Sequence, residues 1–177
     1  MTTALLVIDF QEGVVADAAN VLAVRDNINA LIARARATGT PLVFVQHHDD
    51  ELIRDTPAWQ LREDLAYVPG DHLVEKTFTD SFAGTTLDEA LKAQGATHLV
   101  IAGAQSNWCV NAAARSALVH GYDVTLVADA HTTSDVELPS GTLTGQQIID
   151  YTNLHFHWLG YPGRQVETAT TADITFA

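Results

Sequence analysis

Short apolar runs alternate along the chain with segments of helical periodicity, and this alternation limits the possible folds more than any other feature. The first run, 4–8, has no polar interruption and ends at Asp9, which is typical of a strand buried on both faces. Strands that alternate with helices need crossover connections, and these favour a parallel sheet covered by helices. We therefore expect a three-layer α/β/α fold with a mostly parallel, Rossmann-like sheet.

Six segments are candidate strands, and four are candidate helices. The strands are expected at 4–8, 42–45, 73–76, 98–102, 124–128 and 165–168. The helices are expected at 21–38, 86–95, 109–120 and 144–157. The segment 47–70 sustains no period, so we expect a long connection there, and long connections in compact domains are often functional.

Several residues are expected to mark the ends of these helices. Asn20 is placed to cap the first helix, and Thr86 and Thr144 each begin the spacing of a capping box. Gly39 and Gly121 follow expected helix ends, where a left-handed conformation favours glycine.

Length, charge and cysteine content narrow the class of protein. At roughly 150 residues per domain, 177 residues predict a single domain over 1–177. The net charge of -13 disfavours nucleic acid and anionic membranes as partners. Cys109 is the only cysteine, the N-terminus lacks the pattern of a secretory signal, and the apolar runs are too short to cross a bilayer. We expect a soluble, cytoplasmic protein.

Three reactive side chains follow expected strands. Asp9, Lys76 and Cys109 would all face the crevice at the carboxyl ends of a parallel sheet, where ligands bind. The start of a helix favours a thiolate at Cys109, and an ammonium nearby would add to this effect. A carboxylate could move the protons that such a nucleophile requires. Taken singly, each residue also fits an inert role: a small buried cysteine, a capping aspartate and a solvated lysine.

Four segments together resemble the isochorismatase-like cysteine hydrolases, a family that includes isochorismatases, nicotinamidases and N-carbamoyl amide hydrolases. The first is the opening strand with its Asp-x-Gln, and the second surrounds the lysine. The third contains the cysteine, and the fourth is the strand beyond it. They lie at 6–11, 75–87, 103–117 and 127–130, and together span most of the chain.

The resemblance implies a six-stranded sheet between helices and a triad. In this triad Asp9 is the general base, Lys76 gives electrostatic support and Cys109 is the nucleophile that forms a thioester with an amide substrate. It also implies a non-proline cis peptide at Ala104–Gln105, with the N–H groups of Gln105 and Cys109 as the oxyanion hole. Family members commonly form homodimers or homotetramers, so we expect a homo-oligomer.

Departures from the family pattern leave the substrate open. Ser106, Asn107 and Ala113 stand where many members have threonine, aspartate and threonine. His47, His48 and Asp49 lack the spacing of the nicotinamidase metal site, so we expect no metal. We also expect no organic cofactor, because the chain lacks the glycine motifs of NAD- and ATP-binding loops.

Phe10, Gln11, Trp59, Gln105 and Trp108 are expected to line the substrate pocket, since such pockets combine apolar walls with few polar groups. The aromatic residues could instead fill the core or a subunit interface. An amide or another C–N bond is the preferred target of the reaction. Two alternatives stay open: vinyl ether hydrolysis of the isochorismatase type, and a catalytically silent member of the fold that only binds.

Overall fold

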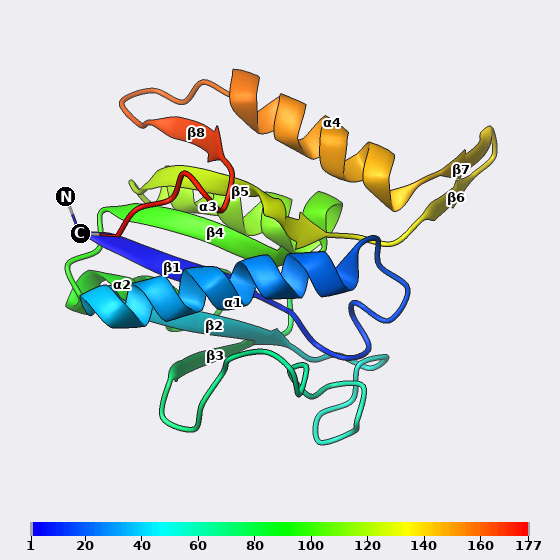
Figure 1. The fold of residues 1–177 in the computed structure, drawn as a ribbon, viewed down its shortest axis with the longest axis horizontal. Coiled ribbons are helices and arrows are strands. Elements are labelled where there is room, and N and C mark those ends of the chain that lie inside the picture. Colours follow the sequence, from blue (N-terminus) through cyan, green and yellow to red (C-terminus); the bar gives the residue numbers. More distant parts are fainter. Residues whose placement is uncertain (1, 177) are drawn as a thin grey trace.

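The computed structural model describes residues 2–176 and has a central sheet of six strands, all paired in parallel (Figure 1). The strand order is β3-β2-β1-β4-β5-β8, so the order reverses between β1 and β4. The strands of this sheet are β1 (Thr3–Ile8), β2 (Leu42–His47), β3 (His72–Lys76), β4 (His98–Ala104), β5 (Asp123–Thr132) and β8 (Val166–Ala169). The predicted α/β architecture is confirmed.

Helices cover both faces of the sheet. They are α1 (Val21–Thr38), α2 (Leu87–Ala93), α3 (Asn111–Val119) and α4 (Gly145–Trp158), and one π-helical turn, η1 (Ser106–Val110), precedes α3. Alternate side chains of β1 enter different cores: Leu6 and Ile8 pack with α2, α3 and α4, whereas Leu5 and Val7 pack with α1. The uninterrupted apolar run of β1 follows from this burial on both faces.

Two expected features of the helix ends are confirmed. The hydroxyl of Thr144 accepts from the N–H of Gln147, and the Gln147 side chain bonds back to the Thr144 backbone, which completes a capping box at the start of α4. Gly39 follows α1 in the left-handed conformation, with a φ of 71°.

Two expected caps are wrong. Asn20 has a φ of 56° and caps nothing with its side chain, which instead donates to Gln146 Oε1 at 2.7 Å. Thr86 makes no capping bond to α2; the hydroxyl of the preceding Thr85 accepts from the Leu87 N–H at 3.3 Å. In both cases a neighbouring group competes successfully for the polar side chain or for the helix N–H.

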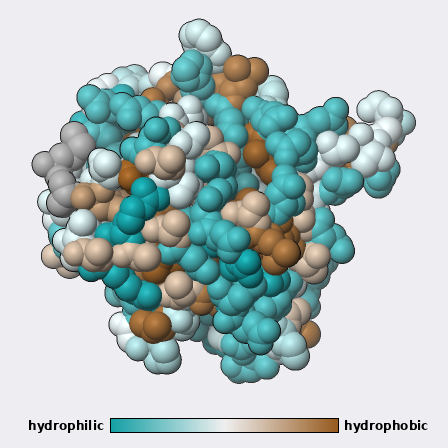
Figure 2. All heavy atoms as spheres, viewed as in Figure 1, coloured by the Kyte–Doolittle hydropathy of each residue, from teal (hydrophilic) through white to brown (hydrophobic). Residues whose placement is uncertain are grey.

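A hairpin that the sequence pattern does not predict follows β5. It consists of β6 (Val136–Leu138) and β7 (Gly141–Leu143), and it stands out from the body of the molecule (Figures 1 and 2). Its strands have three residues each and are largely exposed, so no apolar alternation marks them. Within residues 2–176, no helix is both long enough and apolar enough to cross a membrane.

Gly103 allows β1 and β4 to approach at the point where the strand order reverses. It pairs with Ile8 and has a φ of 124°. A Cβ atom at this position would lie 2.0 Å from the Ile8 carbonyl oxygen, so only glycine fits.

Replacing Gly103 by alanine should therefore destabilise the protein by at least about 4 kcal/mol, because a backbone atom must move. Gly121→Ala is the matched control: Gly121 also has a positive φ, 93°, but nothing lies within 4 Å of the added Cβ. The Gly121→Ala variant should lose only about 1–2 kcal/mol of unfolding free energy. Urea unfolding followed by circular dichroism measures both, and equal losses would contradict the steric argument.

Candidate active site

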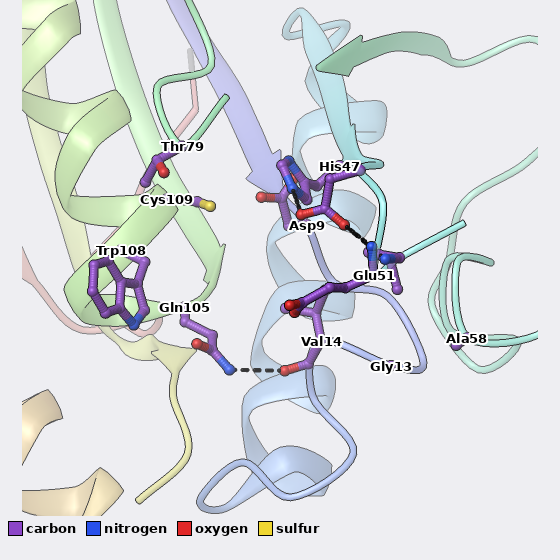
Figure 3. A pocket seen from close by; sticks show the side chains of 12 residues that line it. Asp9, Gly13, Val14, His47, Glu51, Ala58, Thr79, Gln105, Trp108 and Cys109 are labelled. Carbon is purple, nitrogen blue, oxygen red and sulfur yellow. Dashed lines mark hydrogen bonds and ion pairs between the residues drawn. The ribbon is translucent and has the colours of Figure 1, made fainter. Parts of the chain in front are cut away.

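A cavity of about 590 Å³ opens at the carboxyl ends of β1, β2 and β4 (Figure 3). This is the edge of the sheet at which parallel α/β folds bind ligands. Its wall is formed by Asp9, Gly13, Val14, His47, Asp49, Glu51, Leu52, Ala58, Thr79, Gln105, Trp108 and Cys109.

The three residues expected to form a triad meet at this cavity. Lys76 Nζ lies 2.7 Å from Asp9 Oδ2 and 3.3 Å from Cys109 Sγ. Asp9 directly follows β1, Lys76 is the last residue of β3, and Cys109 lies in η1. The side chains of Asp9 and Lys76 are 1% and 0% exposed, so their charges face each other with little solvent between them.

His47 belongs to the same cluster, although we expected for it neither a catalytic role nor a metal. Lys76 Nζ lies 3.2 Å from His47 Nδ1 and donates to the Phe78 carbonyl at 3.1 Å. The other ring nitrogen, His47 Nε2, lies 2.9 Å from Asp49 Oδ2. An ammonium can only donate, so His47 Nδ1 accepts from Lys76 and Nε2–H donates to Asp49. Its position at the end of β2 is the signal that could have identified His47.

Burial raises the pKa of Asp9, and the Lys76 charge opposes this rise. Neither carboxylate oxygen of Asp9 has a hydrogen-bond partner of good geometry among residues 2–176, despite the close ion pair. A carboxylate with a raised pKa and one oxygen outside the ion pair is well suited to accept a proton from a nearby group.

Burial opposes the thiolate that the start of a helix was expected to favour at Cys109. Burial raises the pKa of Cys109 to about 12, the Asp9 charge adds to the rise, and Lys76 opposes it. Cys109 is the fourth residue of η1, and α3 begins only at Asn111, so the sulfur does not sit at the first N–H groups of a regular helix. Burial and the Asp9 charge therefore favour the thiol over the thiolate at Cys109.

Gln105 and Trp108 lie on the cavity wall, as expected. The Ala104–Gln105 peptide bond is cis. The Gln105 side chain donates to the Val14 carbonyl at 3.1 Å, and no partner for its backbone N–H is found within residues 2–176. The Trp108 side chain is well exposed beside Cys109 (Figure 3).

Phe10, Gln11 and Trp59 do not line the cavity, which corrects the expectation for these three. Phe10 and Gln11 are fully buried, and Trp59 is 9% exposed. The Gln11 side chain donates to the carbonyls of His47 and Trp59, at 2.9 and 2.6 Å, and accepts from the His47 N–H at 2.8 Å. Gln11 thus holds the long connection after β2 against the end of β1, because a buried amide must satisfy its hydrogen bonds.

His47 at the end of β2 and His48 after it make different contacts. His48 Nε2 lies 2.9 Å from Arg54 Nη2 and 3.7 Å from Glu75 Oε2, whereas His47 turns to Lys76 and Asp49. Within residues 2–176, no three His, Cys, Asp or Glu side chains gather in a way that could hold a metal ion.

The residues that depart from the family pattern support the turn that carries Cys109. Ser106 Oγ lies 2.7 Å from His131 Nδ1, and His131 Nε2 lies 2.9 Å from Asn153 Oδ1, forming a largely buried polar chain. Asn107 Oδ1 accepts from Thr133 at 2.7 Å. Their contacts in the structure are thus with the protein, at the base of the turn.

The chain is similar to known hydrolases. A streptothricin hydrolase of Streptomyces noursei is 40% identical over 139 residues, which cover 75% of this chain and 50% of that protein. A maleamate amidohydrolase of Pseudomonas putida is 28% identical over 149 residues, 71% of this chain and 70% of that protein. The chain spans about half the length of the streptothricin hydrolases it matches.

Structure and family agree with these relatives. The crystal structure of an isochorismatase family protein matches with a TM-score of 0.84 and 32% identity, covering 95% of this chain and 98% of that one. The model of the Isochorismatase domain matches residues 3–144. The chain therefore belongs to the isochorismatase-like family of hydrolases.

Proposed function

We propose that this hydrolase cleaves the C–N bond of a small amide through a thioester at Cys109. The observation that carries the proposal is the convergence of a thiol, a buried carboxylate and an ammonium on one cavity, with Lys76 Nζ 2.7 Å from Asp9 and 3.3 Å from Cys109 Sγ. Nucleophilic catalysis requires a nucleophile, a base and a group that stabilises the charge formed. The amidohydrolase among the relatives supports the choice of bond.

In the first half of the reaction, Asp9 accepts the thiol proton while Cys109 Sγ attacks the carbonyl carbon. Lys76 stabilises the charge on sulfur as the proton leaves. The developing oxyanion accepts from the N–H groups of Gln105 and Cys109. Asp9 then returns the proton to the leaving nitrogen, the C–N bond breaks, and the acyl group remains on sulfur.

In the second half, water attacks the thioester and Asp9 accepts its proton. The carboxylic acid product leaves as the C–S bond breaks, and the proton on Asp9 returns to Cys109.

Asp9 must begin as a carboxylate, and burial raises its pKa. As the pH is lowered, kcat/KM should therefore begin to fall at a higher pH than it would with an aspartate of ordinary pKa.

Cys109→Ser, Asp9→Asn and Lys76→Met should each lower kcat/KM by about a thousandfold or more, because each removes a group that acts in the transition state. Release of ammonia or amine from streptothricin and from a panel of small primary amides measures this. Glu89→Gln is the control, because Glu89 is exposed on α2 and lies outside the cavity wall. Full turnover in Cys109→Ala would contradict the proposal.

Removing the charge of Asp9 and removing the charge of Lys76 should change the alkylation rate of Cys109 in opposite directions. With a pKa of about 12, the wild-type thiol should react slowly with iodoacetamide at pH 8, and its rate should keep rising to pH 11. Asp9→Asn removes a charge that raises this pKa, so labelling at pH 8 should quicken about tenfold while hydrolysis is lost. Lys76→Met should slow the labelling.

Intact mass reads the labelling without ambiguity, because the chain has one cysteine. Urea-unfolded protein supplies the reference rate of an ordinary thiol. Rapid labelling of the folded wild type at neutral pH would show a resting thiolate and contradict the protonation argued for the site.

A further inference from the structure

The charged residues of the cavity wall are all acidic. Asp9, Asp49 and Glu51 line it, whereas no arginine or lysine does. Lys76 lies beneath the wall with a fully buried side chain, and its charge is paired with Asp9. A substrate entering the cavity therefore meets carboxylates without an exposed cation among the described wall residues.

Two of these carboxylates differ in how they are engaged. Asp49 accepts from the N–H groups of Glu51 and Leu52, at 2.9 and 2.7 Å, and from His47. These bonds lower the pKa of Asp49 to about 2. The Glu51 carboxylate has no hydrogen bond or ion pair within residues 2–176, and its side chain extends from the loop into the cavity (Figure 3). Glu51 is thus available to a ligand.

Asp9 supplies a second, independent observation. It is fully buried at the floor of the cavity; its Oδ2 faces Lys76 Nζ at 2.7 Å, and its Oδ1 lacks a hydrogen-bond partner among the described residues. In the proposed reaction one oxygen takes the thiol proton. Before that transfer Oδ1 is a buried acceptor without a donor, which is unfavourable and favours a substrate that brings an N–H group.

Trp108 lies across the cavity from Glu51 (Figure 3). Its side chain is 57% exposed, although it is large and apolar. The face of an indole attracts a cation, and the attraction strengthens where water is partly excluded. The wall thus offers a cation an aromatic side chain opposite the carboxylate of Glu51.

We propose that this cavity selects amides that carry a cationic group, such as an ammonium, and that Glu51 is the residue that determines this specificity. The hydrolysis of such amides rests on the proposed function. The charge preference of the cavity does not, and it can be measured separately. A carboxylate-bearing substrate would find no cation in the wall, and the net charge of -13 would disfavour its approach.

Charged thiol reagents test the preference without requiring turnover. Cys109 is treated with three methanethiosulfonates, which carry a trimethylammonioethyl, a sulfonatoethyl or an uncharged methyl group. In each case the sulfur of Cys109 forms a mixed disulfide and methanesulfinate leaves. The rate with each charged reagent is divided by the rate with the uncharged one, and intact mass follows the reaction.

The ratio of the rate with the cationic reagent to the rate with the anionic one should be at least about tenfold higher in the folded protein than in urea-unfolded protein. Glu51→Gln should reduce this preference about three- to tenfold. Glu89→Gln removes the same charge from an exposed position outside the wall and should change the preference less than about twofold at 0.15 M salt, because distant charges are screened. No preference, or one that Glu51→Gln leaves intact, would overturn the proposal.

Hydrolysis is measured on three matched amides: β-alaninamide is cationic, propionamide is neutral and succinamate is anionic. The expected order of kcat/KM is cationic, neutral, anionic, and Glu51→Gln should lower the first selectively. A Glu51-dependent reagent preference without hydrolysis of any amide supports the cation site and counts against the proposed function. Hydrolysis that favours succinamate supports the proposed function and overturns the cation site.

Discussion

The buried ion pair of Asp9 and Lys76 is the interaction on which the site depends. Moving two charges out of water costs several kcal/mol per ion, and their attraction offsets this only if the remaining protons find acceptors. Lys76 finds them in the Phe78 carbonyl, His47 Nδ1 and Cys109 Sγ. The residues around the nucleophile are therefore also those that make the buried ammonium tolerable, so the chemistry and the stability of the site share one set of contacts.

The sheet holds this pair in place. Lys76 ends β3 and Asp9 follows β1, with β2 between them, so their separation depends on the register of three strands. The third partner reaches the pair because β4 approaches β1 at Gly103, where any side chain would collide with the Ile8 carbonyl. Backbone hydrogen bonds and one missing Cβ thus position the reactive atoms more rigidly than loops could.

Much of the fold and the triad could be predicted because both follow from local order. Apolar runs mark β1 and its neighbours, and the residues that end parallel strands must share an edge. The cavity wall could not be predicted in the same way. Gln11 follows Asp9 by two residues, yet it turns into the protein to bond the loop at His47 and Trp59, and only the path of that loop decides this. The hairpin after β5 was missed because its short, exposed strands bury no apolar face.

The protonation of Cys109 shows why position alone misleads. Placement near a helix start favoured a thiolate, but the sulfur lies in η1 before α3, and burial and the neighbouring carboxylate raise the pKa of Cys109. A neutral thiol needs both a base and a step that makes the loss of its proton favourable. The attack on the carbonyl is that step, because in the proposed reaction Asp9 accepts the proton as the C–S bond forms. The Asp9 carboxylate that raises the pKa of Cys109 is then also the group that removes its proton.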